Sequence, residues 1–293
     1  MAVFVKFWGT RGSIPTPGHK TKRYGGNTSC VEIRVDDQLF ICDGGTGLRE
    51  LGLELGARGE GAIEAHMFFS HMHWDHIQGF PFFVPAYSSK NELNVYEVAP
   101  GDDRVQRLLH GQMRSDYFPV KFSDLGATIA SRSFENGETQ VGPVKVRCME
   151  QTHPGQSFAY SFEVGGLKVV YATDNELDLN ILNREASDHD PALLRRLPDE
   201  FVRFVSDADL LISDGQYTEE EYPKKVGWGH ARANTVVDLA IQAGVKRCAI
   251  FHHDPLHADE FMERKIKIAR DRVEAAGKEL EIFGAREGLE LKL

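Results

Sequence analysis

The chain has 293 residues, of which 41% are hydrophobic and 27% are charged, and its formal net charge is −10 at pH 7. This composition is typical of a globular protein, and no run of 18 apolar residues is present that could form a transmembrane helix. The acidic charge argues against a large, sequence-independent nucleic-acid interface, which would need clustered lysine and arginine. A small nucleotide or the end of an RNA stays possible, because a local basic patch or bound metals could attract phosphate.

The N-terminal segment, Met1-Ala2-Val3-Phe4-Val5-Lys6, lacks the basic, apolar and small-residue regions of a signal peptide and is typical of a strand. A cytoplasmic location is therefore expected. The cysteines lie far apart and form no CxxC pair, so we expect buried free thiols and neither disulfides nor a zinc knuckle. They are Cys30, Cys42, Cys148 and Cys248.

Apolar patterns and breaker residues divide the chain into short strands and a few helices. The expected strands cover residues 2–8, 29–35, 38–42, 64–70, 92–97, 127–133, 140–151, 156–164, 167–173, 208–213, 247–252, 280–283 and 288–292. The expected helices cover residues 48–55, 103–113, 191–205, 233–243 and 258–276. Asp36-Asp37 and Gly165-Gly166 are expected to form hairpin turns between adjacent strands.

The first part of this pattern is rich in strands, whereas the later part alternates strands and helices. We therefore expect two β-sheets packed together, with helices on the outside. No linker rich in Pro, Gly or Ser and no internal repeat divides the chain, so residues 1–293 are expected to form one domain. Residues 176–206 are acidic and less regular, which makes them the candidate for an insertion that acts as a lid or a dimer element.

The strongest chemical signal is the stretch His71-Met72-His73-Trp74-Asp75-His76, which directly follows an apolar, strand-like run. Imidazole and carboxylate groups are ligands of borderline divalent metals such as zinc. If the strand ends near Ser70, His71 and His73 can point the same way. Asp75 and His76 then follow the bend and can address a second point, so the motif suits two metals better than one.

Several strand-like segments end in a residue that could bind metal, and strand ends at a common sheet edge are where sites collect in layered α/β folds. These residues are Asp43, His71, His153, Asp174, Asp214 and His252. One metal would be bound by His71, His73 and His153, and the second by Asp75, His76 and His252. Asp174 would bridge the two, because a carboxylate has two oxygens. Each ion would keep a position for water or substrate, as catalytic sites do.

In this order, the His71-to-His76 motif, His153, Asp174 and His252 resemble the signature of the metallo-β-lactamase superfamily, and the match covers nearly the whole chain. The resemblance implies an α/β fold, a four-layer αβ/βα sandwich with two mixed β-sheets flanked by helices and a dinuclear site on its upper edge. Gly229-His230 before a helix, with the opening at residues 9–13, is similar to the tRNase Z and phosphodiesterase branch. In that branch the histidine that matches His230 is implicated in protonating the leaving group.

The sequence departs from tRNase Z: the long Gly/Pro-rich arm that grips tRNA is not evident, and residues 176–206 are acidic. We therefore expect the substrate to be a cyclic nucleotide or a similar small phosphodiester, and we do not expect a long nucleic acid or a membrane as a partner. A homodimer is suggested by analogy alone.

The expected function is that of a dinuclear metal-dependent phosphodiesterase. A hydroxide held between two divalent cations, Zn²⁺ as first choice and Mn²⁺ or Fe²⁺ as alternatives, would attack phosphorus. Asp75 would orient this hydroxide, and His230 would protonate the leaving alkoxide.

Three other functions are weighed against this one. A tRNA 3′-end endonuclease is an alternative that the missing arm disfavours. A carbonyl-ester hydrolase of the lactonase or thioesterase type is a second, but His230 argues against it, because leaving-group protonation matters more for an alkoxide departing from phosphate. A di-iron electron-transfer module is disfavoured because such branches usually replace one cluster histidine with a carboxylate, and here the histidines at 71, 73 and 76 are retained.

Two loop residues have open roles at this point. Arg11 could contact an anionic substrate, although a solvated loop arginine is the simpler interpretation. Asp43, at a strand end beside glycines, could cap the following helix or support the metal ligands through hydrogen bonds.

The C-terminal histidines are also ambiguous. His252 is favoured over His253 as the last ligand because it matches the family position after the strand, and adjacent strand residues point to opposite faces. His253 and Asp214 could instead support the ligands through hydrogen bonds. His257 is expected to cap a helix or to face solvent.

Overall fold

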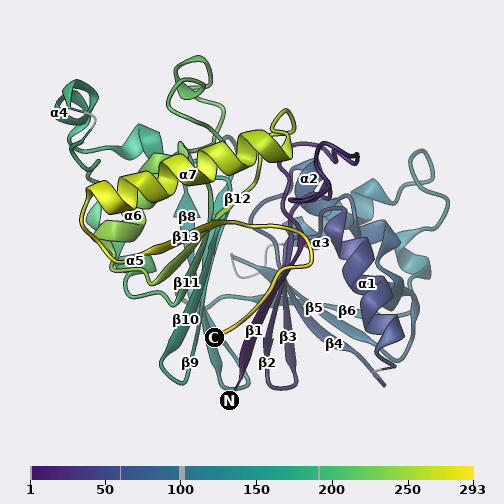
Figure 1. The fold of residues 1–293 in the computed structure, drawn as a ribbon. Helices are drawn as coiled ribbons and strands as arrows, with labels where there is room; N and C mark the ends of the chain where they lie inside the picture. Colours follow the sequence, from purple (N-terminus) through teal and green to yellow (C-terminus); the bar gives the residue numbers. More distant parts are fainter. Residues whose placement is uncertain (1, 60, 99–102, 191) are drawn as a thin grey trace.

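Two seven-stranded β-sheets face each other in the computed structural model, which describes residues 2–59, 61–98, 103–190 and 192–293 (Figure 1). The first sheet has the order β14-β1-β2-β3-β4-β5-β6. Its strands are β1 (Val3–Gly9), β2 (Cys30–Val35), β3 (Gln38–Cys42), β4 (Glu64–Phe68), β5 (Glu92–Glu97), β6 (Thr128–Ser133) and β14 (Glu290–Lys292). Pairing is antiparallel from β14 to β3 and parallel from β3 to β6.

The second sheet repeats this division into an antiparallel and a parallel half, with the order β13-β12-β11-β10-β9-β8-β7. Its strands are β7 (Glu138–Val141), β8 (Val144–Gln151), β9 (Ser157–Val164), β10 (Leu167–Ala172), β11 (Leu210–Asp214), β12 (Arg247–Phe251) and β13 (Glu281–Gly284). Pairing is antiparallel from β7 to β10 and parallel from β10 to β13.

Helices cover the outer face of each sheet (Figure 1). The α-helices are α1 (Gly47–Ala57), α2 (Trp74–Ile77), α3 (Arg104–Gln112), α4 (Arg184–His189), α5 (Asp199–Val205), α6 (Ala233–Gln242) and α7 (Asp259–Ala275). The 3₁₀ turns are η1 (Phe80–Phe82), η2 (Val84–Tyr87), η3 (Phe122–Asp124), η4 (Leu177–Asn180) and η5 (Tyr222–Lys224). With α1 and α3 outside the first sheet and α5, α6 and α7 outside the second, the predicted four-layer sandwich is confirmed.

The core between the sheets is rich in aromatic side chains from both. Phe68 of β4 stacks on Tyr96 of β5 with ring centroids 4.3 Å apart, and it meets Phe162 of β9 edge-on at 5.3 Å. On the outside, α1 buries Leu48, Leu51 and Leu55, whose spacing places them on one helical face. The buried side chains therefore form one core between the two sheets and one beneath each helical layer.

Two element predictions need correction. The expected helix over 191–205 begins at a residue outside the described ones, and residues 192–198 are irregular, so that only α5 is helical. Pro198 occupies its N-cap position, and a proline lacks the N–H that a helix interior needs. The expected strand over 140–151 is a hairpin of β7 and β8, in which Gly142 turns the chain at φ 53°.

The four cysteines are free, as expected, although Cys148 is only half-buried. None of the helices in the described part of the chain combines the length and apolar character needed to span a bilayer.

Candidate metal centre

The ends of several strands gather the candidate ligands at one edge, the upper one in Figure 1. Cys42 of β3 pairs with Phe68 of β4, and Ser213 of β11 pairs with both Ala172 of β10 and Ile250 of β12. Strands β8 and β10 run in the same direction, because each is antiparallel to β9. The residues that follow these strands therefore emerge together, as the sequence predicted. They are Asp43, His71, His153, Asp174 and His252, and Asp214 closes β11.

Three of these strand-end residues adopt a left-handed backbone conformation. The φ angles are 60° at Asp43, 52° at Asp174 and 55° at His252. This conformation costs roughly 1–2 kcal/mol for a residue with a Cβ atom, and it persists where the surrounding structure holds the side chain in place. All three side chains are almost completely buried at the sheet edge.

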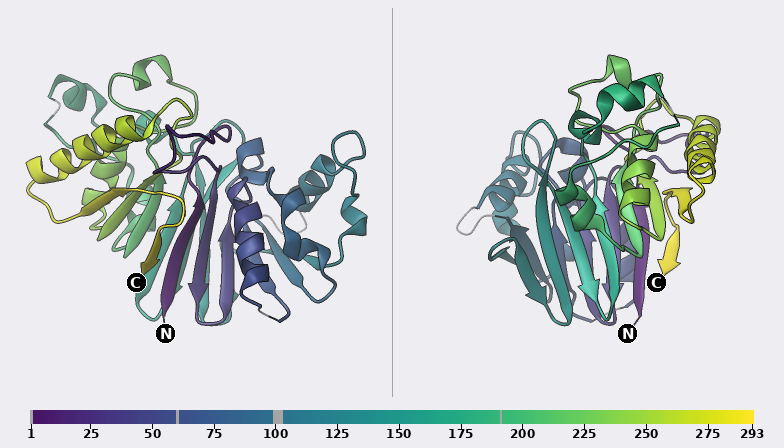
Figure 2. Two further views of the ribbon diagram at one scale, coloured as in Figure 1. Left: turned by 45° about the vertical axis from the view of Figure 1, so that its right-hand side comes forward. Right: turned by 90° about the vertical axis from the view of Figure 1, so that its left-hand side faces the viewer.

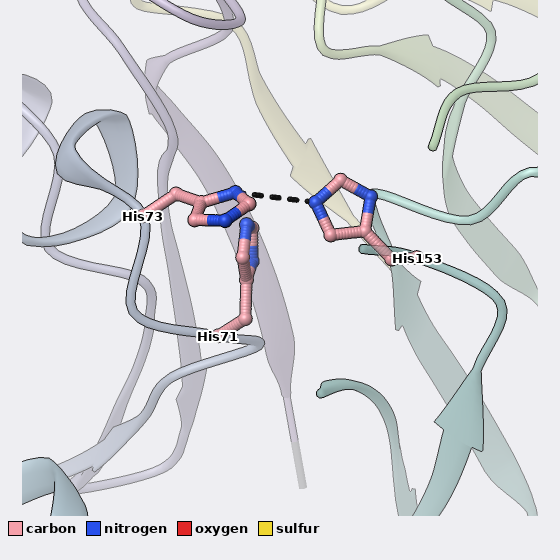
Figure 3. Close-up of side chains that lie close together, drawn as sticks. All are labelled: His71, His73 and His153. Carbon is pink, nitrogen blue, oxygen red and sulfur yellow. Dashed lines mark hydrogen bonds between the residues drawn. The ribbon is translucent and has the colours of Figure 1, made fainter. Parts of the chain in front are cut away.

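His71, His73 and His153 form the first cluster of nitrogen donors (Figure 3). Nδ1 of His73 lies 3.2 Å from Nε2 of His153, and the ring of His71 lies 4.4 and 4.7 Å, centroid to centroid, from those of His73 and His153. Each residue offers one possible ligand atom, and these three atoms lie within 4.8 Å of one another. Three converging imidazoles are a common zinc ligand set.

Asp75, His76 and His252 form the second cluster. Oδ2 of Asp75 lies 3.2 Å from Nε2 of His76 and 3.1 Å from Nε2 of His252, and the two Nε2 atoms lie 3.3 Å apart. These are the three residues that the sequence assigned to the second metal.

Asp174 lies between the two clusters and presents one carboxylate oxygen to each. Oδ2 lies 3.7 Å from Nε2 of His71 and 3.8 Å from Nε2 of His153. Oδ1 lies 3.3 Å from Nε2 of His76 and 3.2 Å from Nε2 of His252. This placement is what a bridging carboxylate requires.

The outer nitrogen of each buried imidazole has a hydrogen-bond partner, which leaves the inner nitrogen directed at the centre. His76 Nδ1 lies 2.7 Å from Asp43, His153 Nδ1 lies 2.9 Å from the Gly229 carbonyl, and His252 Nδ1 lies 3.2 Å from Gln216. Within the described part of the chain, Nε2 of His71 is buried and has no hydrogen-bond partner. Metal-binding histidines are oriented in this way, so the donor set fits divalent cations.

Charge supports the same conclusion. Burial, with His76 nearby, holds the pKa of His71 well below its ordinary value, so its ring is neutral and keeps a lone pair for a metal. At Asp75, burial raises the pKa, but His76 and His252 outweigh burial and hold it well below its ordinary value. At His76, burial lowers the pKa, but Asp75, Asp174 and Asp43 raise it well above its usual range. A cation that binds there displaces that proton and neutralises the buried carboxylates.

Asp43 supports the ligands and does not cap α1. Its carboxylate accepts hydrogen bonds from the Ser70 backbone and hydroxyl at 2.7 and 2.8 Å, from Tyr171 Oη at 2.6 Å and from His76 Nδ1. The N-cap of α1 is Thr46. Asp43 thus ties β3, β4 and β10 to the His76 ring.

His230 stands beside both clusters in an open pocket of about 280 Å³. Its Nδ1 lies 2.7 Å from Asp214 Oδ2, and its ring stacks on that of His252 with centroids 4.9 Å apart. Burial lowers the pKa of His230, but the Asp214 carboxylate outweighs burial and raises it to about 9. In the metal-free chain the imidazole therefore holds its proton at neutral pH, and it is placed to give a proton to a group bound in the pocket.

The loop that carries His230 is held by two buried carboxylates that sequence reasoning did not single out. Glu176 accepts hydrogen bonds from the backbone N–H groups of Gly227 and Gly229, both at 2.7 Å. Asp178 accepts from the backbone and side chain of Arg232 at 2.8 and 2.7 Å. Two residues at the start of segment 176–206 therefore support this loop, and in Figure 2 the green parts of the chain, which include this segment, lie above and outside the second sheet. The acidic composition of the segment was the available signal, but it did not identify the partners.

The structure distinguishes the roles of the adjacent histidines 252 and 253. His252 lies in the second cluster, whereas His253 is buried and its Nε2 lies 2.7 Å from the Ala285 carbonyl. The expectation that His257 faces solvent or caps a helix is wrong, because it is 2% exposed and its Nε2 lies 2.8 Å from Glu221.

Arg11 fits neither of its two expected roles. It is fully buried, and its guanidinium donates to the backbone carbonyls of Gly25, Asp254 and His257 at 2.8–2.9 Å. It therefore joins the N-terminal loop to the segment after β12. That loop also supplies the Ser13 N–H, which donates to Asp75 Oδ2 at 2.7 Å and was not foreseen.

Comparison with known proteins agrees with this geometry. A sequence profile described as "Beta-lactamase superfamily domain" matches residues 40–253. Ribonuclease Z of Haloarcula marismortui is 25% identical over 331 aligned positions, covering 100% of this chain and 97% of the relative. The metallo-beta-lactamase fold protein YhfI from Bacillus subtilis superposes with a TM-score of 0.70 at 18% identity, covering 100% of this chain and 99% of that one. Human tRNase Z, short form, superposes with a TM-score of 0.64 at 16% identity, covering 98% of both chains.

These similarities confirm the superfamily and the branch that the motifs predicted, and they correct one expectation. We did not expect a long nucleic acid as a partner, yet relatives that match 100% and 89% of the chain are named ribonuclease Z, after the cleavage of RNA. The expectation is wrong because net charge averages over the whole surface, whereas phosphate is attracted by the local charge of a site.

Proposed function

The chain belongs to the β-lactamase superfamily and is a metal-dependent hydrolase, and from this premise we propose that it is a phosphodiesterase that cleaves RNA, as a tRNA 3′-end endonuclease does. The observation that carries the proposal is His230, whose Nδ1 lies 2.7 Å from Asp214 Oδ2 and which shares a pocket with residues of the two clusters of candidate metal ligands. A protonated imidazole in this position serves the departure of an alkoxide from phosphorus.

In this proposal, His71, His73 and His153 would hold one divalent cation, and Asp75, His76 and His252 would hold a second. Asp174 lies between the two sets of residues and would serve both. Zinc is the first choice because the donors are imidazoles and carboxylates, with manganese or iron as alternatives. The bound cations would supply a hydroxide at neutral pH and would stabilise negative charge on the phosphoryl oxygens.

The chain's own residues provide orientation and the proton. Asp75, fixed by the Ser13 N–H, accepts a hydrogen bond from the attacking water and orients it. His230 protonates the leaving oxygen through Nε2, because its Nδ1 is engaged by Asp214. Glu176 holds the backbone on one side of His230 and thereby keeps its ring over the pocket.

A small phosphodiester such as a cyclic nucleotide is the second candidate substrate. The observation that favours it is the pocket itself, whose volume of about 280 Å³ is close to the lower limit of about 300 Å³ for small-molecule sites. A long Gly/Pro-rich arm is also not evident in the sequence.

The test is turnover of a precursor tRNA with a 3′ trailer, 2′,3′- and 3′,5′-cyclic nucleotides, and a lactone and thioester panel, by zinc-loaded protein. His230→Ala is expected to lower kcat for the phosphodiester substrate by about 10²–10⁴-fold, which is typical of a lost general acid. His189→Ala, which removes an exposed histidine of α4, is the matched control and is expected to leave kcat unchanged. Turnover of the lactone or thioester alone, insensitive to His230→Ala, would refute the proposal.

A further inference from the structure

Two of the three tryptophans in the chain are largely exposed: Trp74 lines the pocket of the candidate metal centre, and Trp228 directly precedes Gly229, whose carbonyl lies 2.9 Å from His153 Nδ1. Trp8 is half-buried and donates to Glu32 at 2.8 Å. Trp74 is 63% exposed and Trp228 is 58% exposed. An exposed indole leaves a large apolar surface in contact with water, so two of them beside one site need an explanation.

Trp74 stands within the metal-binding motif itself, between His73 and Asp75, and it lines the same pocket as His230. It is the first residue of α2, and its carbonyl accepts a hydrogen bond from Gln78 N at 2.9 Å. The backbone that carries this indole is therefore set by the helix on the first-sheet side of the pocket.

Trp228 comes from the second-sheet side, in the loop that leads to His230. The buried carboxylate of Glu176 binds the N–H groups of Gly227 and Gly229, the two neighbours of Trp228 in the chain, at 2.7 Å. The Gly229 carbonyl in turn holds His153. A buried anion that fixes the backbone on both sides of an exposed ring presents that ring in one position.

Positive charge accompanies Trp228. The Lys225 ammonium lies 3.8 Å from the centroid of the Trp228 ring and 5.8 Å from that of Tyr217, whose ring meets the His230 ring edge-on at 5.9 Å. Lys224 next to it is exposed. In a chain with a net charge of −10, this loop therefore offers cations and an aromatic face together near the candidate proton donor.

We propose that Trp74 and Trp228 are stacking sites for nucleobases of the RNA on the two sides of the scissile phosphodiester, and that Lys225 contacts an adjacent phosphate. The metal centre recognises a phosphodiester but carries nothing that distinguishes a nucleotide from another diester. Aromatic rings supply that distinction without sequence preference, because every base has a π face. This inference rests on the proposed function and names the part of the substrate that the pocket rim binds.

Binding to the zinc-loaded protein is measured without cleavage, from the quenching of tryptophan fluorescence and the anisotropy of a fluorescein-labelled single-stranded RNA with non-hydrolysable linkages. Trp74→Ala and Trp228→Ala are each expected to weaken binding by about 5- to 150-fold, the usual range for one lost stacking contact. Trp74→Phe and Trp228→Phe keep an aromatic face and are expected to recover most of the affinity. Leu53→Ala, which removes a 44%-exposed apolar side chain of α1, is the control and is expected to bind as the parent does. A thermal melt of each variant verifies that it is folded.

A double-mutant cycle with abasic RNA identifies the contact as stacking. An abasic nucleotide at the position that faces a tryptophan is expected to weaken binding by the parent protein but to have little further effect on the alanine variant, since both changes remove the same contact. Fully additive losses, or alanine variants that bind RNA as the parent does, would overturn the inference. Sedimentation showing that Trp228→Ala dissociates a dimer while RNA affinity stays the same would also overturn it and assign the exposed rings to a second copy of the chain.

The two levels of proposal fail separately. If RNA binding depends on the tryptophans but the zinc-loaded protein does not cleave RNA, the proposed function fails and the stacking sites stand. If RNA is cleaved with the same kcat/KM by the parent and both alanine variants, the function stands and the stacking sites fail.

Discussion

Replacement of Asp43 by asparagine tests whether the hydrogen bonds that hold the candidate ligand His76 in place determine metal affinity. Asp43 is 1% exposed, and its two oxygens face four donors at 2.6–2.8 Å, which are the Ser70 N–H and hydroxyl, the Tyr171 hydroxyl and His76 Nδ1. An asparagine keeps the shape, but its NH₂ group must face at least one of these donors in either orientation. One buried donor then loses its acceptor, at a cost of about 1–3 kcal/mol in unfolding free energy.

The effect on the metal comes through the His76 ring, which loses its charged partner and its fixed orientation. Losses of this kind lower metal affinity by about 10–100-fold, or about 1.4–2.8 kcal/mol. The assay is a competition titration of zinc against a chromophoric chelator, with urea unfolding for stability. Asp209→Asn is the matched control, because Asp209 is also buried and accepts from Lys168 N and Lys246 but lies at the opposite end of β11. An Asp43→Asn protein that binds zinc as tightly as the Asp209→Asn protein would refute the reasoning.

Three further predictions concern the same centre. In metal-free protein, an NMR titration is expected to give a His230 pKa near 9, and Asp214→Asn is expected to lower this pKa, because Asp214 contributes more than Asp174 and Asp75 to the charge that opposes burial; an unchanged titration would contradict the Asp214 assignment. Glu176→Gln is expected to raise hydrogen exchange at Gly227 and Gly229 by roughly tenfold or more, since two bonds to a charged acceptor weaken, and unchanged exchange there would show that the loop is held by other contacts. Removal of metal by EDTA is expected to lower the melting temperature, because a ligand at 100 times its Kd stabilises the folded state by about 2.7 kcal/mol; equal melting temperatures with and without zinc would argue against tight binding.

The ligand clusters were predictable because their chemistry is local or strand-linked. His71 and His73 are two residues apart, and Asp174 and His252 each follow a strand-like segment, so an arrangement of these strand ends at one sheet edge could be expected, and the parallel pairing of β10, β11 and β12 provides it. Two packed sheets with helices outside followed from the alternation of strands and helices, whereas the mixed strand directions were implied by the family resemblance.

The supporting residues could not be predicted in this way, since their partners are distant in the chain. The sequence alone does not separate a helix-capping role for Asp43 from a supporting one, because the His76 ring that it contacts lies 33 residues away in the chain. Glu176 binds backbone groups 51 and 53 residues further on. Arg11 looked solvated in a loop of glycines and prolines, but its buried site exists only where the segment after β12, more than 240 residues away, packs on that loop.

The expectation that a long nucleic acid is not a partner failed for a different reason. The net charge of −10 counts every surface carboxylate equally, but the groups that would meet RNA are the metals, Lys225 and the two exposed indoles. Composition therefore says little about a site that occupies a small part of the surface.

The most direct test of the central claim is anomalous diffraction from crystals of the zinc-loaded protein. We predict two zinc peaks, one among His71, His73 and His153 and the other among Asp75, His76 and His252, with an oxygen of Asp174 at each. A single peak, or peaks outside these clusters, would contradict the proposed two-metal centre and the hydrolytic mechanism built on it.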